Sequence, residues 1–292
     1  MRIHMVAIGS TGDVRPYALL GKELKKRGHE VTLVAFADFA DMAKEAGLGF
    51  RPLSGNVREM MARLMKPGVK GAAFLRQVEK SLGRVAPLLL DDLLDAFKDA
   101  EVMICAFLGN TYYSVAEKYH IPVIQTQYFP MDANNVTPIS SAPGIKWGRA
   151  WNRASYGIGY MLIHMVEKRY LTKWRKANRL TVPKMHPGPD YDFDNRTIPV
   201  LYAISSLVMP RPAAWGPNIH MTGFWWDNTP VDWTPPAALT AFMEAGETPI
   251  YVGFGSMVSG DMDKTFTIVM RALKASGIRA IVAKGWGGGE LH

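Results

Sequence analysis

The opening of the chain, RIHMVAIGSTGDVRP at Arg2–Pro16, constrains the fold more than any other stretch. Residues 3–8 are mostly apolar with little alternation, as expected for a strand buried on both faces of a parallel sheet. A glycine turn follows at residues 9–13, and apolar residues then recur at the spacing of one helix face, at positions 14, 17, 20 and 24. This order predicts the start of a doubly wound α/β domain, in which ligands bind outside the carboxyl ends of the strands.

The turn itself is suited to an anion. Gly9 and Gly12 let a ligand come close to the main chain, and the free N–H groups at a helix start favour negative charge. The G-x-x-G spacing differs from the G-x-G-x-x-G of dinucleotide dehydrogenases, which argues against a nicotinamide cofactor. Two roles are open to Asp13: it caps the helix that follows, or it meets the ligand.

Strands and helices alternate along most of the chain. Strands are expected at 31–36, 48–53, 101–106, 123–127 and 198–203, and helices at 39–46, 56–64, 69–97, 111–119, 149–176 and 237–244. Residues 128–148 read as a long polar loop, whose place after a strand favours function. The opening pattern then restarts, with strands at 249–252 and 279–283, a glycine turn at 253–256 and a helix at 264–275. We therefore expect an N-terminal domain at 1–223, a linker at 224–247 and an incomplete second domain at 248–292.

The net charge of +8 is concentrated in one segment. Residues 146–184 contain ten Lys and Arg residues and a single acid, Glu167. Nucleic acid is not the expected partner, because zinc-finger spacing, an RNA-binding aromatic signature and a basic zipper are all missing. Contact with an anionic membrane surface is one interpretation, and a solvated basic face is the other. Apolar residues at 151, 158, 161, 162, 165, 166 and 171 of the helix there are more typical of core than of a binding surface.

Other features bound the location and chemistry of the chain. No apolar run is long enough for a membrane span, and the start is too short for a secretory signal. The single cysteine, Cys105, excludes an internal disulfide and favours a reducing, cytoplasmic compartment; its apolar surroundings predict a core thiol rather than a nucleophile. The seven histidines lack metal-ligand spacing, so no metal site is expected.

Four motifs together resemble a known family. They are GSTGDVRP at Gly9–Pro16, HMTGFWW at His220–Trp226, YVGFGSM at Tyr251–Met257 and RAIVAKGWGG at Arg279–Gly288. In this order and spacing they resemble the bacterial and fungal branch of glycosyltransferase family 1, which includes sterol glucosyltransferases and antibiotic glycosyltransferases. The resemblance implies a GT-B-like α/β fold: a Rossmann-like parallel-sheet domain that holds the acceptor, followed by an incomplete second Rossmann-like domain.

That resemblance also implies an activity and its site. The expected enzyme is an inverting hexosyltransferase that moves sugar from a UDP-sugar to a hydroxyl of an apolar acceptor, such as a sterol or lipid-like alcohol, without a cofactor or an essential metal. Asp13 becomes the base that takes the proton of the acceptor hydroxyl. Expected donor-binding residues are Ser10, Thr11, Gly12, Gly255, Ser256 and Trp286, and expected acceptor-binding residues are Phe107, Tyr128, Phe129 and Met131.

One part of the family pattern is not found. The donor-binding His-Gly-Gly-rich segment and its Asp/Gln pair normally lie beyond the position of the last residue here. The second unit is therefore expected to self-associate, to dock on the first domain or to await a partner chain. An alternative function follows from this: a non-catalytic acceptor-binding half that works only with a separate donor-domain chain.

Overall fold

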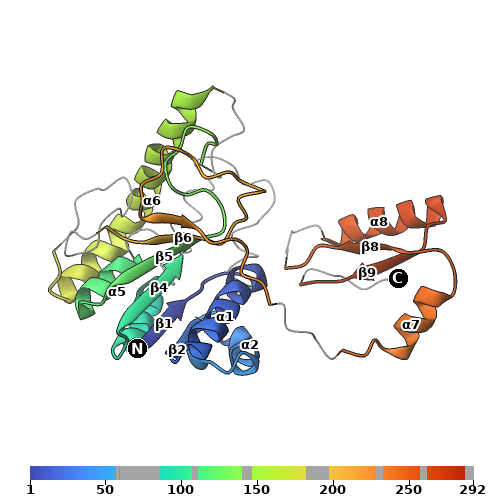
Figure 1. Ribbon diagram of the computed structural model, residues 1–292, viewed down its shortest axis with the longest axis horizontal. Helices are drawn as coiled ribbons and strands as arrows, with labels where there is room; N and C mark the ends of the chain where they lie inside the picture. The colour runs from blue at the N-terminus through green and yellow to red at the C-terminus, as the bar shows by residue number, and fades with distance from the viewer. Residues whose placement is uncertain are drawn as a thin grey trace.

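A computed structural model describes residues 1–56, 59, 86–106, 111–139, 147–181, 197–227, 233–256 and 262–286. Seven parallel strands form the main sheet, in the order β3-β2-β1-β4-β5-β6-β7 (Figure 1). The strands are β1 Arg2–Val6, β2 Glu30–Phe36, β3 Gly49–Leu53, β4 Val102–Ala106, β5 Val123–Gln127, β6 Val200–Tyr202 and β7 Ile219–Met221. The helices of this domain are α1 Thr11–Lys26, α2 Ala40–Glu45, α5 Thr111–Tyr119 and α6 Arg149–Ala177, with a 3-10 turn at Ala37–Phe39 and a further helix at 86–97.

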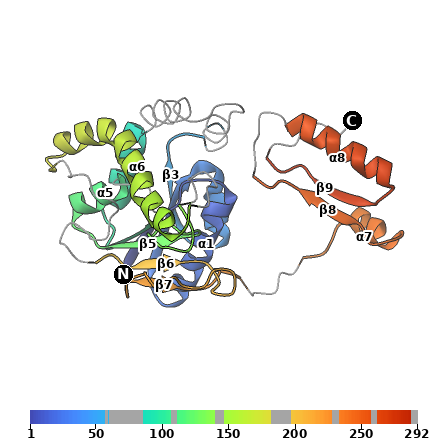
Figure 2. The ribbon, with the colours of Figure 1, turned by 90° about the horizontal axis from the view of Figure 1, so that it is seen from above.

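Helices cover both faces of this sheet, as a doubly wound fold requires. Two consecutive residues of β5 show this. Thr126 Oγ1 is hydrogen-bonded to the hydroxyl of Tyr17 in α1, whereas Gln125 Oε1 accepts a hydrogen bond from the hydroxyl of Tyr113 in α5. Successive strand residues point to opposite faces, so α1 and α5 lie on different sides. The view from above shows α6 on the same side as α5 (Figure 2).

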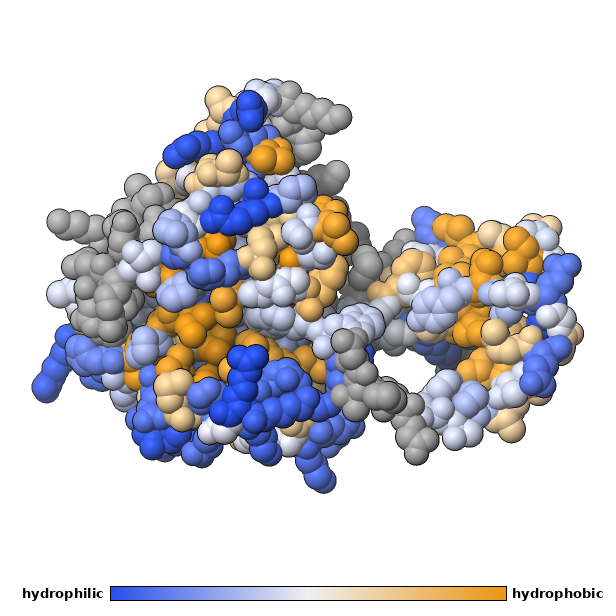
Figure 3. Space-filling view, in the orientation of Figure 1, coloured by the Kyte–Doolittle hydropathy of each residue, from blue (hydrophilic) through white to orange (hydrophobic). Residues whose placement is uncertain are grey.

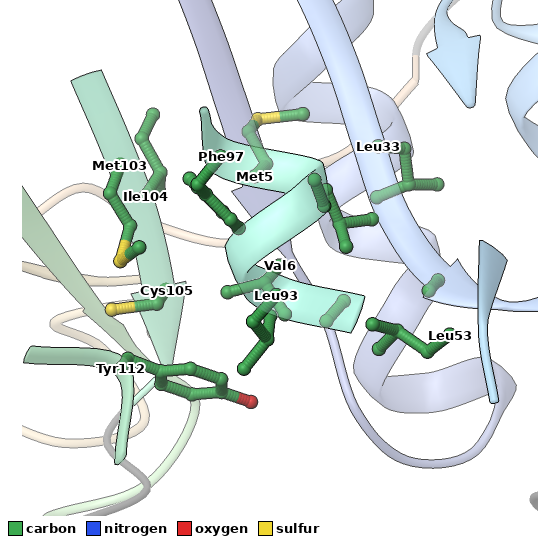
Figure 4. Packing of buried hydrophobic residues seen from close by; sticks show 14 of the residues in the cluster. Met5, Val6, Leu33, Leu53, Leu93, Phe97, Met103, Ile104, Cys105 and Tyr112 are labelled. Carbon is green, nitrogen blue, oxygen red and sulfur yellow. The ribbon is translucent and has the colours of Figure 1, made fainter. Parts of the chain in front are cut away.

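The core lies where the helix at 86–97 packs on the central strands. Leu93 and Phe97 of that helix are fully buried among Met5, Met103 and Cys105 (Figure 4). Burial raises the pKa of the Cys105 thiol, so the sulfur is protonated and unreactive, as expected of a core cysteine.

A second, smaller unit follows, made of β8 Ile250–Gly253, α8 Met262–Ser276 and β9 Ala280–Ala283. In the described residues β8 and β9 pair in parallel as a sheet of two strands, and the helix α7 (Ala237–Glu244) precedes them. Phe266 is buried between α8 and the strands, but Tyr251 of β8 is 70% exposed. Apolar side chains are visible on the surface of this unit and of the first (Figure 3).

Two expectations from the sequence need correction, and one lies mostly outside the described residues. The short strand β7 was not expected. Ile158, Met161 and Met165 of α6 are exposed rather than core, because the opposite side of that helix, with Tyr156, Leu171 and Trp174, packs inward. The helix expected at 56–64 and residues 69–85 of the next one fall outside the described ranges, save for Asn56 and Glu59. Within those ranges, none of the helices is both long and apolar enough to cross a bilayer.

Candidate functional site

The turn between β1 and α1 is built around Asp13. Ser10 is the N-cap of α1, and its backbone N–H donates to Asp13 Oδ2 at 2.6 Å, while its hydroxyl donates to the same oxygen at 3.0 Å. Asp13 is therefore not the N-cap that the sequence suggested. It stands at the third helical position and reaches back to the cap, as the acidic member of a capping box does. Thr11 and Gly12 complete the first turn of the helix, which points its N–H groups out of the carboxyl end of the sheet.

The two carboxylate oxygens of Asp13 have different surroundings. Oδ2 holds Ser10, but Oδ1 has no hydrogen-bond partner among the described residues, and the side chain is only half-buried. Gly9 makes this arrangement possible: its φ is +148°, and a Cβ there would lie 2.2 Å from Oδ2. The turn thus fixes the carboxylate through one oxygen and leaves the other able to accept a proton.

Aromatic side chains from three distant segments meet behind this turn. The rings of Tyr17, Tyr128 and Trp225 pack edge to face in all three pairs, with centroids 6.1–6.2 Å apart. Tyr128 also donates its hydroxyl to the backbone carbonyl of Asp13 at 3.2 Å. The cluster therefore braces the turn from β5 and from the segment after β7, as T-shaped aromatic pairs can. Trp225 was not among the expected site residues, although it lies in the HMTGFWW motif.

The segment that follows β5 is folded tightly rather than loose. Tyr202 of β6 accepts hydrogen bonds at its hydroxyl from the backbone N–H groups of Met131 and Asp132, at 3.1 and 3.0 Å, and donates to Asp132 Oδ2. Asn134 Oδ1 accepts from two further N–H groups, those of residues 136 and 137. Burial raises the pKa of Tyr202, so this hydroxyl stays protonated and keeps its donor role.

The structure separates the expected acceptor-binding residues. Tyr128 lies against Asp13, whereas Met131 is buried with Ile139 and Tyr156 in a small cluster beside α6. Phe129, between them in sequence, is 46% exposed. Phe107 lies outside the described residues.

In the smaller unit, the turns after β8 and β9 lie against each other. The backbone N–H of Trp286 donates to the carbonyl of Gly255 at 2.9 Å, and Gly285 fits there only without a Cβ, which would stand 2.1 Å from that oxygen. The expected donor-binding residues Gly255 and Trp286 are thus brought together, with Ser256 next in the chain. Trp286 also packs against the main core cluster of the first domain.

Comparison with known proteins shows which families this chain resembles. Residues 3–138 match the glycosyltransferase family 28 N-terminal domain. A sterol 3-beta-glucosyltransferase of Aspergillus fumigatus is 30% identical over 296 residues, which cover 98% of this chain and 20% of the relative. The chain is thus similar to sterol glucosyltransferases over nearly its whole length. A UDP-sugar-dependent glycosyltransferase 52 of Dictyostelium discoideum is 29% identical over 99% of this chain and 18% of its own length.

A solved structure supports the fold of this chain. The calicheamicin glycosyltransferase CalG4 superposes with a TM-score of 0.60 at 18% identity, over 98% of this chain and 66% of the other. The expected GT-B-like α/β fold and the resemblance to sterol glucosyltransferases are therefore confirmed, although the matching domain bears the name of family 28 rather than family 1. The chain spans about a fifth of the length of the curated relatives.

Proposed function

We propose that this chain belongs to an inverting glycosyltransferase that moves a hexose from a UDP-sugar to the hydroxyl of an apolar, sterol-like acceptor, with Asp13 as the base. One observation carries the proposal. At the carboxyl end of β1 stands a carboxylate with one oxygen anchored and the other without a partner among the residues that the structure describes, in a chain that matches sterol glucosyltransferases over 98% of its length.

The proposed chemistry uses residues of both units. Asp13 Oδ1 takes the proton of the acceptor hydroxyl as its oxygen attacks the anomeric carbon of the sugar. The bond from that carbon to the diphosphate breaks, and UDP leaves with the electron pair. Backbone N–H groups of Thr11 and Gly12 and those at the turn of Gly255 and Ser256, with Trp286 beside that turn, offset the charge that develops on the diphosphate. This route needs neither a metal nor a cofactor.

Product analysis tests this function. The chain, with the donor half of a sterol glucosyltransferase fused after residue 292, is incubated with labelled UDP-glucose and a 3β-hydroxysterol, and lipid-extractable label is counted. We expect a labelled steryl glycoside of inverted configuration. Label that enters only small polar acceptors would contradict the proposal.

A second candidate function is an acceptor-binding half that is inactive by itself. It is favoured by the smaller unit, whose described part pairs only two strands and leaves both outer strand edges open. Such edges invite pairing with a second copy or with a partner chain. Calorimetric titration with UDP distinguishes the two functions: we expect weak or undetectable binding by the 292-residue chain, whereas tight binding by the monomer would show that the donor site is already present.

We also propose that α6 contacts anionic membrane, in a cytoplasmic protein. Ile158, Met161 and Met165 recur at three- and four-residue intervals and are 43%, 39% and 61% exposed. Trp147 is 66% exposed beside Trp151, at a ring separation of 4.7 Å. Exposed basic residues flank this stripe, namely Arg149, Arg153, Lys168, Lys173 and Lys176. Arg175 does not contribute, because it is buried against Glu117.

Vesicle flotation tests the membrane contact. Basic residues contribute about 1 kcal/mol each near an anionic surface, so binding to phosphatidylserine vesicles is expected at low salt and is weakened at high salt. Met165→Glu should reduce binding, whereas Leu207→Glu, at an apolar side chain that is 95% exposed elsewhere, should not. If both variants bind the vesicles equally, the exposed apolar side chains of α6 do not contact the membrane.

A further inference from the structure

Two buried polar atoms near the carboxyl end of β5 have no hydrogen-bond partner in the described part of the chain. They are Nε2 of Gln127 and Nδ1 of His164. Gln127 is only 3% exposed and immediately precedes Tyr128, which contacts Asp13. A buried donor left unpaired costs on the order of 1–3 kcal/mol, so its presence at the ligand end of a parallel sheet requires an explanation.

The strand register places Gln127 beneath the segment that follows β5. Gln127 and Gln125 share the face of the sheet that α5 covers, where Gln125 accepts a hydrogen bond from Tyr113 at 2.6 Å. Gln127 is also the register partner of Tyr202 in the neighbouring strand β6, and the Tyr202 hydroxyl accepts hydrogen bonds from the N–H groups of Met131 and Asp132. The Gln127 side chain therefore lies on the face of the sheet near residues 131–132.

The helical spacing of α6 brings His164 to the same region. Tyr160, one turn earlier, donates its hydroxyl to the carbonyl of Met131. Glu167, one turn later and buried, accepts a hydrogen bond from Thr111 Oγ1 at 2.9 Å, at the first residue of α5. His164 is thus held between the Met131 segment and the start of α5. Burial and the nearby Lys168 lower the pKa of His164, so its ring is neutral at pH 7 and has one nitrogen able to accept a hydrogen bond.

We propose that Gln127 and His164 bind a second oxygen of the acceptor, distinct from the hydroxyl that Asp13 deprotonates. A hydroxyl fits both groups, because its oxygen accepts from Gln127 Nε2–H while its own proton is donated to His164 Nδ1. The proposal rests on the proposed function and narrows its substrate class: the preferred acceptor is an apolar polycyclic molecule with a second hydroxyl. Gln127 and His164 are then specificity-determining residues.

Thermal unfolding of the full chain gives the first test, independent of any acceptor. Gln127→Met keeps the volume and removes the unpaired amide, so we expect an unchanged or raised Tm. Gln125→Met is the matched control, because it removes a buried amide whose oxygen is satisfied, and it should lower the Tm. A Tm loss in Gln127→Met as large as that of the control would overturn the inference, since Gln127 would then be a structural residue.

Equilibrium binding of a steroid mono-ol and the corresponding diol gives the second test. The unmodified chain is expected to bind the diol about tenfold more tightly, and Gln127→Met and His164→Phe should each remove most of that preference. A preference that survives in both variants contradicts the inference. If neither steroid binds the unmodified chain, the apolar-acceptor proposal fails, while the Tm comparison still decides whether Gln127 serves the fold alone.

Discussion

Replacing Asp13 by Asn separates its capping role from its proposed role as base, because capping uses Oδ2 and the proposed proton transfer uses Oδ1. The amide oxygen of Asn can still accept from Ser10, but the charge at the helix N-terminus is lost, together with the charge-assisted part of two hydrogen bonds. A charge at that position is worth about 0.3–1 kcal/mol, and charge-assisted hydrogen bonds are stronger than neutral ones by a similar amount. We therefore expect the free energy of unfolding to fall by about 1–2 kcal/mol.

The effect on transfer should be much larger. A positioned general base contributes about 10²–10⁴-fold, which corresponds to roughly 3–5 kcal/mol of activation free energy. Both quantities are measured in the fusion with a donor half: urea unfolding gives the stability, and label transferred to a sterol gives the rate. The expected result is a fold that is nearly intact and a rate that falls at least a hundredfold.

The chain offers a matched control for this substitution. Asp92 holds a serine through the same two donors, but with both oxygens: Oδ2 accepts from the backbone N–H of Ser54 at 2.6 Å, and Oδ1 accepts from its hydroxyl at 3.1 Å. Asp92→Asn should therefore cost similar stability without a loss of rate. If Asp13→Asn retains transfer within a few-fold while losing the same stability as Asp92→Asn, capping is the whole role of Asp13 and the base assignment is refuted.

Three further predictions concern the framework of the site. Trp225→Ala should lower the free energy of unfolding by about 2–3 kcal/mol, somewhat less than for a fully buried Trp. Trp226→Ala, at a side chain that is 77% exposed, should be close to neutral. If urea unfolding gives equal losses for the two variants, the aromatic cluster does not stabilise the fold. His4 donates its Nδ1–H to the carbonyl of Ala96. Burial lowers the pKa of His4 below 6.5, so the unfolded chain takes up a proton that the folded ring resists. Stability should thus be full above about pH 6.5 and decline as the pH falls below it, and His4→Gln should remove part of that decline in Tm measured from pH 7.5 to 5.5; identical pH profiles would contradict this. Arg175→Met should lower the free energy of unfolding by about 3–5 kcal/mol, because it leaves Glu117 and Ser114 without the buried guanidinium that binds them. Lys98→Met, at an exposed pair with Asp95, should hardly change the Tm. Equal effects of the two substitutions would contradict a stabilising role of the buried pair.

Much of the framework could be predicted because it depends on local pattern. Continuous apolar runs identified β1 and β4, and the bounds of α5, β5 and α7 agree with the structure. The strand β7 has only three residues, Ile219–Met221, and its pairing with β6 is a long-range choice that no local periodicity encodes. Helix α6 was recognised but its inward side was not, since aromatic and charged residues with tertiary partners occupy that side.

The candidate site was predictable in position but not in detail. The glycine turn indicated where the ligand end of the sheet lies, and Asp13 stands there. Its place at the third helical position depends on where α1 begins, which differs by one or two residues between equally plausible sequence interpretations. Gln127 and His164 could not be recognised, because whether a buried polar atom is satisfied depends on neighbours from other elements.

The contact between α1 and the segment after β7 has a consequence for how the chain is made. Lys22 forms an ion pair with Asp227 at 2.7 Å, across 205 positions of sequence. The ring contact between Tyr17 and Trp225 joins the same two segments. During synthesis the N-terminal helix therefore emerges long before the residues that cover it. Contacts of such separation close slowly, and surfaces that wait for them are exposed to aggregation and to proteases. Nascent chains from which Trp225 has not yet emerged should consequently remain sensitive to protease at α1, and protection should arise abruptly once the tryptophan has left the ribosome.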